Sequence, residues 1–168
     1  MKNKIWLLVL VCLMFGCAKT PGPVTNTAEP PSIRSIDVVK ATPQPVTIAA
    51  GESGDAVVAI QISNGYHVNA NPPTFSYLKA TELEITPADG ISVEFMRYPD
   101  ALSKTFAFAD KPLAVYEGET ILTARLKADK SAKPGPHNLS AKLRVQACDE
   151  SVCYAPGELA VSLPVSIR

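Results

Sequence analysis

The sequence predicts an all-β protein, an antiparallel β-sandwich of about seven to nine strands. From Ile36 onward, short segments rich in β-branched residues follow one another, separated by Gly, Pro, Asn and Asp. Several alternate apolar with polar residues, as in 122–127 and 139–145, a pattern typical of strands with one buried and one solvated face. No segment has the periodicity of a long amphipathic helix. We find no internal repeat and no sign of a second domain, so we expect one sandwich over residues 36–168.

Each expected strand is a short apolar or alternating run bounded by turn-forming residues. They lie at 35–40, 56–63, 66–69, 82–86, 92–97, 114–117, 120–127, 138–147 and 158–167. Gly90, Gly118 and the Lys-Pro-Gly-Pro run at 133–136 fall between these strands, where hairpins or sheet crossings would turn.

Residues 1–16 have the features of a lipoprotein signal peptide. Lys2 and Lys4 precede an apolar run, 5–15, that is too short to span a bilayer as a helix. The run ends in Leu-Met-Phe-Gly-Cys, which resembles a bacterial lipobox with Cys17 as the lipid acceptor. The alternative is an ordinary secretory signal in which this cysteine is incidental.

We therefore expect a mature protein that begins at acylated Cys17 on the periplasmic side of a bacterial membrane. Ala18, in place of Asp, favours the outer membrane. Residues 17–35 comprise the lipidated cysteine and a flexible linker rich in Pro, Thr, Ser and Gly. Loss of the signal removes two lysines and leaves 14 basic against 16 acidic residues, a net charge of −2. This balance does not indicate nucleic-acid binding.

Cys148 and Cys153 are the only cysteines that remain free in such a mature chain, in a compartment where disulfides persist. Their C-x4-C spacing between two β-rich runs places them near the mouth of a hairpin. A bridge over so short a loop stabilises a fold by only about 2 kcal/mol, so a structural role is only weakly motivated. Asp149 and Glu150 lie between them without a nearby cation, so both are poor attacking thiols and suit a relay with an activated partner cysteine.

Three segments together resemble the periplasmic N-terminal domain of the thiol:disulfide interchange protein DsbD. They are Gly-Tyr-His-Val-Asn-Ala-Asn-Pro-Pro at 65–73, Val-Tyr-Glu-Gly at 115–118 and Cys-Asp-Glu-Ser-Val-Cys-Tyr-Ala-Pro at 148–156. The cysteine motif is the most specific part, and the resemblance covers about four-fifths of the chain. It implies an immunoglobulin-like β-sandwich that relays electrons between a thioredoxin-like donor and periplasmic thioredoxin-fold acceptors.

The resemblance also implies roles for individual residues. Cys153 would form the mixed disulfide with the partner, and Cys148 would resolve it. Because the sequence ends at Arg168, without the membrane and thioredoxin-like domains of DsbD, we expect a separate DsbD-like membrane electron conduit to supply electrons. The implied protein is a monomer that needs no organic cofactor.

In the family, a cap loop with an aromatic residue shields the disulfide. By spacing, Phe108 is our first candidate for this cap and Phe106 our second, although both could be core strand residues. His67 lies where the family carries a tyrosine, and it could steady a thiolate, shuttle a proton or simply form a hydrogen bond at a strand end. Asn69 shares its face under strand alternation and could contact a partner, and Tyr154 adjoins Cys153.

Two other functions remain open from the sequence. One is a non-catalytic immunoglobulin-like binding or assembly lipoprotein whose disulfide only pins a hairpin. The other is a copper-handling module that uses Cys148, Cys153 and His67, since two thiolates and an imidazole suit copper or zinc. We predict no metal site, because the chain has no C-x2-C and no close His or Met pair for a further ligand. No hydrolase motif stands out.

Overall fold

The computed structural model describes residues 32–168, and Ser32–Arg168 form one compact unit. The predicted signal peptide, Cys17 and nearly all of the predicted linker lie outside the described residues. No α-helix occurs in the described part of the chain, which is built from strands and one 3-10 turn, η1 (Ser35–Val38). None of its elements is a helix that could cross a membrane.

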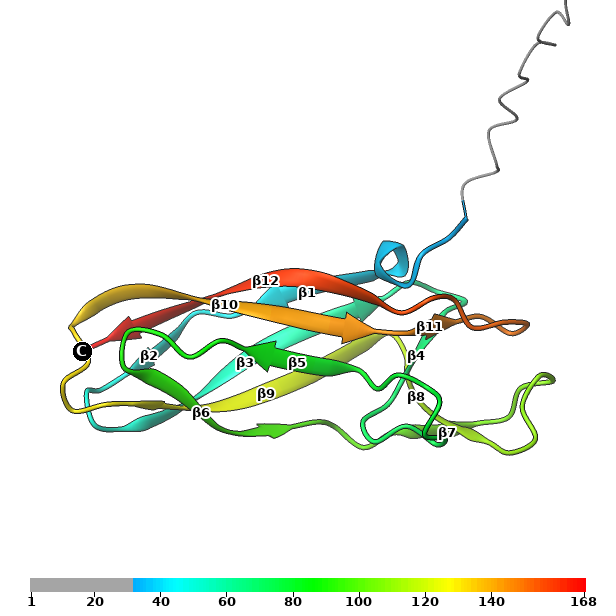
Figure 1. Ribbon diagram of the computed structural model, residues 1–168, viewed down its shortest axis with the longest axis horizontal. Coiled ribbons are helices and arrows are strands. Elements are labelled where there is room, and N and C mark those ends of the chain that lie inside the picture. The colour runs from blue at the N-terminus through cyan, green and yellow to red at the C-terminus, as the bar shows by residue number, and fades with distance from the viewer. Residues whose placement is uncertain (1–31) are drawn as a thin grey trace, which may run out of the picture. The chain divides into compact units, whose positions relative to one another are not determined.

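Two four-stranded sheets form the sandwich (Figure 1). The first has the order β1 (Val39–Pro43), β3 (Ser53–Ile62), β9 (Glu119–Ala128), β6 (Ile91–Arg97). The second has the order β2 (Val46–Ile48), β12 (Gly157–Ile167), β10 (Gly135–Val145), β5 (Glu82–Ile85). All neighbouring strands are antiparallel except β2 and β12. The predicted immunoglobulin-like, all-β antiparallel sandwich is confirmed.

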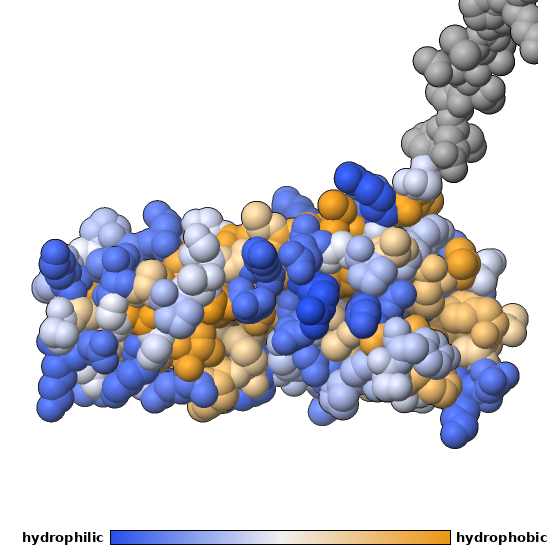
Figure 2. Space-filling view, viewed as in Figure 1, coloured by the Kyte–Doolittle hydropathy of each residue, from blue (hydrophilic) through white to orange (hydrophobic). Residues whose placement is uncertain are grey.

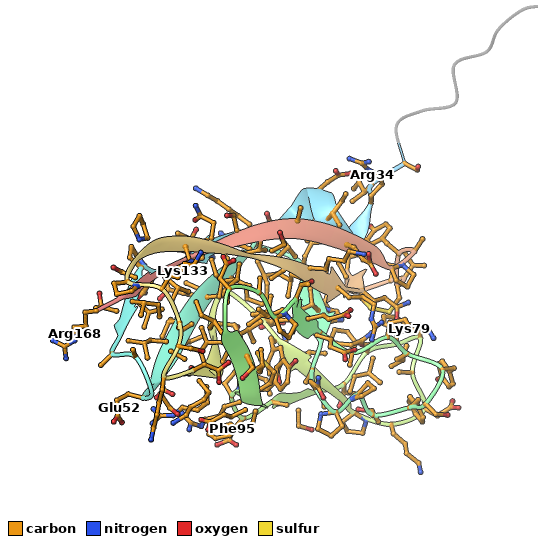
Figure 3. All side chains as sticks on the ribbon, turned by 60° about the vertical axis from the view of Figure 1, so that its left-hand side comes forward. Arg34, Glu52, Lys79, Phe95, Lys133 and Arg168 are labelled. Carbon is orange, nitrogen blue, oxygen red and sulfur yellow. A yellow bond between two sulfur atoms is a disulfide. The ribbon has the colours of Figure 1, made fainter. Side chains whose placement is uncertain are left out.

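A third, smaller sheet extends one end of the sandwich. Its order is β11 (Ala147–Cys148), β4 (His67–Asn69), β8 (Leu113–Tyr116), β7 (Leu102–Lys104), and every pair is antiparallel. In Figure 3, Glu52 and Arg168 lie at the opposite end of the sandwich from Lys79, whose backbone N–H contacts the residue just before β11. The small sheet thus carries the cysteine segment at the end away from the C-terminus.

The core lies between the two large sheets, where alternate residues of the long strands point inward. β9 alternates exposed or half-buried residues with buried ones along its whole length, and β10 and β12 do so over most of theirs. Fully buried aliphatic side chains from both sheets fill the interior: Ile60, Ile62, Leu122, Leu126, Leu139, Leu143 and Leu163. Each such side chain contributes about 1.5–3 kcal/mol of transfer free energy. Hydrophilic residues interrupt the hydrophobic ones on the outer surface (Figure 2).

Most of the predicted strands occur, with local differences that have physical causes. The segment predicted as a strand from 35 begins with η1, because Ser35 is held by side-chain hydrogen bonds, and the strand starts at Val39. The run predicted as 138–147 is divided at Gln146 into β10 and β11. The sequence did not indicate β2, which has three residues, or β7, whose side chains are mostly exposed. The predicted turn glycines Gly90 and Gly118 have φ of +74° and +59°, which glycine adopts without strain.

Candidate functional site

The two cysteines lie in the connection between the longest paired strands. The β10–β12 register runs from Gly135 opposite Ile167 to Val145 opposite Gly157, and residues 146–156 join the two strands beyond that point. Cys148 and Cys153 face each other there and form a disulfide, with their Cα atoms 3.9 Å apart. Cys148 is fully buried, whereas Cys153 is half-buried. An incoming thiol can therefore reach the sulfur of Cys153 more readily than that of Cys148.

The loop between the cysteines is closed by Asp149. Its Oδ1 accepts hydrogen bonds from the backbone N–H groups of Ser151 (2.7 Å) and Val152 (2.9 Å), and its Oδ2 accepts one from the hydroxyl of Tyr154 (2.6 Å). These donors lower the pKa of Asp149, with the tyrosine hydroxyl contributing most. Reciprocally, the carboxylate raises the pKa of Tyr154 to about 12. A permanent negative charge thus sits beside the disulfide and disfavours the thiolate form of either cysteine.

Ser35 holds the base of this loop from the far end of the described sequence. Its buried hydroxyl donates a hydrogen bond to the carbonyl of Ala155 (2.6 Å) and accepts one from the N–H of Ala147 (2.9 Å). The N–H of Tyr154 donates to the carbonyl of Ala147 at 2.8 Å. The strand ends that carry the cysteines therefore have links that do not depend on the disulfide.

Gln146 provides a further link on the other side. Its Oε1 accepts from the N–H of Lys79 (2.8 Å) and the Nδ2 of Asn69 (3.1 Å), while its Nε2 donates to the carbonyl of Tyr154 (3.3 Å). Asn69 is fully buried, so its amide contacts this interior network rather than the surface. Neither Ser35 nor Gln146 was predicted from sequence, because the partners of each lie between 8 and 120 residues away along the chain.

His67 lies directly across from the buried cysteine. In the antiparallel pairing of β4 with β11, His67 is the partner of Cys148. The imidazole is only 1% exposed, and its Nε2 has no hydrogen-bond partner in the described structure. The ring stacks on Phe106 with centroids 4.1 Å apart. Burial lowers the pKa of His67, so the ring is neutral at neutral pH.

The predicted cap phenylalanines lie in the connection between β7 and β8, residues 105–112. We call this segment the cap loop. Phe106 is 3% exposed and packs inward, whereas Phe108 is 40% exposed and stacks on Phe106 at 5.4 Å. Phe108 also lines a cavity of about 240 Å³ together with Tyr77, Val152 and Cys153. Phe108 and Cys153 thus line the same cavity, while Phe106 stacks on the histidine.

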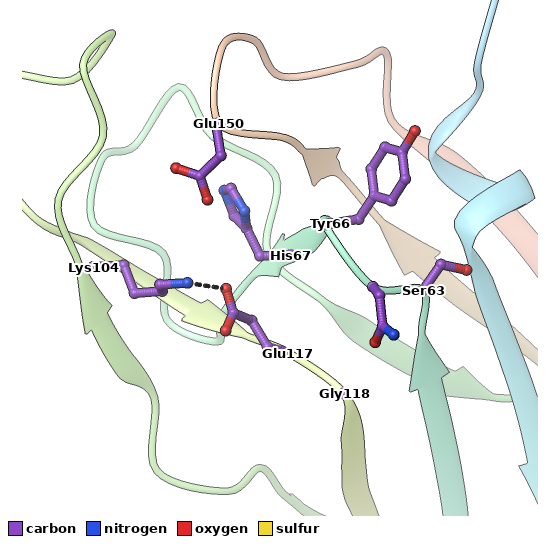
Figure 4. A pocket seen from close by; sticks show the side chains of 9 residues that line it. Ser63, Tyr66, His67, Lys104, Glu117, Gly118 and Glu150 are labelled. Carbon is purple, nitrogen blue, oxygen red and sulfur yellow. Dashed lines mark hydrogen bonds and ion pairs between the residues drawn. The ribbon is translucent and has the colours of Figure 1, made fainter.

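A second, more polar cavity of about 380 Å³ is lined in part by His67. Lys104 and Glu117 form an ion pair at its edge, with Nζ and Oε1 2.6 Å apart. Figure 4 shows the imidazole of His67 between this pair and the carboxylate of Glu150, which comes from the cysteine loop. Among residues 32–168, no group of three or more His, Cys, Asp or Glu side chains is arranged to hold a metal ion.

A β-sandwich that presents one half-buried disulfide sulfur beside an aromatic loop has the features of a thiol:disulfide exchange domain. Residues 36–164 match the family model described as thiol:disulfide interchange protein DsbD, N-terminal. The chain belongs to this family, as the cysteine motif predicted. No curated protein sequence matches the chain significantly.

Solved structures of low sequence identity accompany this match. The N-terminal periplasmic domain of ScsB from Proteus mirabilis is 20% identical over 74% of this chain, with a TM-score of 0.52, and the likeness shows a shared fold. The chain spans 44% of that ScsB chain. The reduced DsbD N-terminal domain of Neisseria meningitidis is 19% identical over 70% of this chain and 82% of its own, with a TM-score of 0.46. A complex of the DsbD and PilB N-terminal domains from the same organism matches at 20% identity over 64% and 73%, with a TM-score of 0.43.

Proposed function

We propose that this chain is a periplasmic thiol:disulfide interchange module that relays electrons through Cys148 and Cys153. Its donor would be a DsbD-like membrane conduit or thioredoxin-like protein, and its acceptors would be periplasmic thioredoxin-fold proteins. The observation that carries the proposal is the asymmetry of the disulfide. Cys153 is half-buried beside a cavity bordered by the cap loop, whereas Cys148 is fully buried behind it. Membership of the DsbD N-terminal family also supports a role in thiol:disulfide exchange.

This asymmetry supports a different role for each sulfur in the proposed relay. In the reduced chain, the Cys153 thiolate attacks a partner disulfide, so that one partner sulfur leaves as a thiolate and a mixed disulfide forms. Cys148 then gives up its proton and attacks the sulfur of Cys153, which releases the second partner sulfur. Two electrons and two protons have then passed from the Cys148/Cys153 dithiol to the partner. The same steps in reverse reload the module.

The surface around Cys153 suits transient docking. Tyr77, Phe108 and Val152, which line the cavity, are 72%, 40% and 50% exposed. An apolar rim of this kind can be covered by a partner in the exchange complex and left in contact with water afterwards. Because Phe108 lines the cavity beside Cys153, the cap loop must move aside before the partner sulfur can approach Cys153.

We further propose that the module works as a monomer anchored by acylated Cys17, with the residues between Cys17 and η1 as its tether. The apolar run before Gly16-Cys17 supports a lipoprotein signal, and Ala18 favours the outer membrane. A tether of this kind limits the module to partners within reach of the membrane surface.

The decisive experiment is trapping of the mixed disulfide in the periplasm. Cys148→Ser leaves Cys153 without its resolving partner, so covalent adducts with thioredoxin-fold proteins should accumulate and disappear on reduction. Cys153→Ser is the matched control and should trap far less, because Cys148 is buried. If neither variant forms adducts and the purified disulfide exchanges with no thioredoxin-like protein, the bridge is structural and the relay is excluded.

A further inference from the structure

The position of His67 in the small sheet has a chemical consequence. Cross-strand partners in an antiparallel pair point to the same face, with Cβ atoms about 4.5–5.5 Å apart. His67 and Cys148 are such partners, so the imidazole and the sulfur that must lose a proton during resolution project from neighbouring strands on the same face of the small sheet. No other titratable side chain is paired with a cysteine in the described sheets.

The hydrogen bonding of His67 is incomplete in the oxidised state. Its Nε2 is buried without a partner, although buried polar groups are almost always satisfied. While the disulfide is closed, Cys148 has no proton to donate. When the disulfide opens, its S–H becomes a donor next to an imidazole nitrogen that can accept. The unpaired nitrogen is thus explained if its partner appears only in the reduced form.

We propose that His67 is a catalytic residue, the general base that takes the proton from Cys148 as this thiol resolves the mixed disulfide. The inference rests on the proposed exchange function and adds the proton transfer that it requires. The Cys148 S–H bond breaks as its proton moves to the imidazole, and a bond forms between the sulfurs of Cys148 and Cys153. The bond from Cys153 to the partner sulfur breaks, and the leaving thiolate takes up a proton, which the imidazolium can return.

The charges around the ring suit this transient protonation. Glu117 from the β8–β9 turn and Asp149 and Glu150 from the cysteine loop all favour the imidazolium. Lys104 from β7 opposes it, but this cation is already paired with Glu117. The stacked Phe106 holds the ring in place and presents a π-face that also attracts a cation. Because burial lowers the pKa of His67, the ring is unprotonated before the reaction and can accept the proton of Cys148.

The assignment explains how a thiol in an unfavourable place can react. Cys148 is fully buried and lies next to the Asp149 carboxylate, and both features disfavour a free thiolate. Concerted removal of the proton by a neighbouring base avoids forming that thiolate before attack.

Resolution can be measured with a small disulfide in place of a protein partner. The full chain carrying Cys12→Ser and Cys17→Ser is reduced and mixed with excess 5,5′-dithiobis(2-nitrobenzoate) in a stopped-flow instrument. The first thionitrobenzoate released reports attack by Cys153. The second reports intramolecular attack by Cys148, and its rate is independent of reagent concentration. His67→Gln should slow the second release by about a hundredfold near pH 7, the lower end of general-base effects, and leave the first unchanged.

The controls separate a chemical role from a structural one. His137→Gln, at the end of β10 away from the cysteines, where the ring contacts Asp89, should leave both phases unchanged. With His67 in place, a plot of the logarithm of the second-phase rate constant against pH should change slope at the pH where the NMR signals of His67 titrate. This test needs no variant at that position. Equal slowing of both phases, a second phase within about threefold of the unsubstituted rate, or the absence of that change in slope would overturn the role of His67. If the first release itself were missing, the exchange function would fail, and the role of His67 with it.

Discussion

The hydroxyl of Tyr154 donates a 2.6 Å hydrogen bond to Oδ2 of Asp149. The residue that follows Cys153 is thereby hydrogen-bonded to the residue that follows Cys148. This bond closes the loop a second time, beside the disulfide itself. It also fixes the orientation of a carboxylate within the loop that joins the two cysteines.

Replacing this carboxylate should release the tyrosine. In Asp149→Asn, the pKa of Tyr154 should fall from about 12 toward 10.0, because the neutral amide no longer penalises the phenolate. An ultraviolet titration of tyrosinate absorbance measures the change. Tyr154→Phe identifies which of the five tyrosines is responsible, since it should remove the highest-pKa transition. An unchanged titration in Asp149→Asn would show that the bond does not persist in solution.

Acid should open the same loop only at low pH. The folded pKa of Asp149 is lowered below 3.8, so its stabilising contribution is complete above the unfolded pKa and is lost as pH falls through the folded value. We expect the amide signals of Ser151 and Val152, which donate to this carboxylate, to be steady at pH 5 and to shift below about pH 4. A transition near pH 5 would contradict the hydrogen-bond network.

The two histidines should affect stability in opposite ways. Burial lowers the pKa of His67, so the unfolded chain binds its proton more tightly and the contribution of His67 to stability is lost as pH falls below about 6.5. The carbonyl of Lys133 and the carboxylate of Asp89 raise the pKa of His137, so its contribution is present below 6.5 and lost as pH rises through the folded value. The free energy of unfolding, measured with urea between about pH 5 and 8, should depend on pH differently from the unsubstituted protein in His67→Gln and in His137→Gln. The two substitutions should change this pH dependence in opposite directions.

Ser35 should be worth more to stability than an average surface serine. Ser35→Ala leaves the buried N–H of Ala147 without its acceptor, so the free energy of unfolding should fall by about 1–3 kcal/mol. Ser162→Ala, on the exposed face of β12, is the matched control and should change it by less than about 0.5 kcal/mol. Equal effects of the two substitutions would show that η1 does not hold the cysteine segment.

The two cap-loop phenylalanines should separate into a structural and a shielding residue. Phe106→Ala removes a buried ring and should cost about 3–5 kcal/mol of stability. Phe108→Ala should cost much less, since its ring is 40% exposed, but it should speed reduction of the disulfide by small thiols because the cavity beside Cys153 is opened. Comparing urea unfolding with the rate of reduction by dithiothreitol distinguishes these outcomes. A slower or unchanged reduction rate in Phe108→Ala would exclude a cap.

The local pattern of the chain was enough to predict the long strands but not the links between distant segments. The alternation in β9 and β10 predicted their buried faces because each of these strands packs one side on a common core. β7 was missed since its three residues have no buried face, and Ser35 because its two partners lie 112 and 120 residues away. Alternation also could not separate Phe106 from Phe108, which are two positions apart and differ only in how the loop folds back.

The disulfide itself should be a minor support of the fold. A loop of this length stabilises a protein by about 2 kcal/mol through the entropy of the unfolded chain. Here Ser35 and the bond from the Tyr154 N–H to the Ala147 carbonyl still hold the base of the loop after reduction. We therefore expect reduction to lower the free energy of unfolding by no more than about 2 kcal/mol and to leave amide exchange in β10 and β12 slow. Hydrogen exchange of the oxidised and reduced protein, with the Cys148→Ser, Cys153→Ser double variant as a reference that cannot reoxidise, tests this. Loss of protection throughout both strands on reduction would identify the bridge as a structural staple, because a domain that unravels each time its disulfide opens could not serve as a relay.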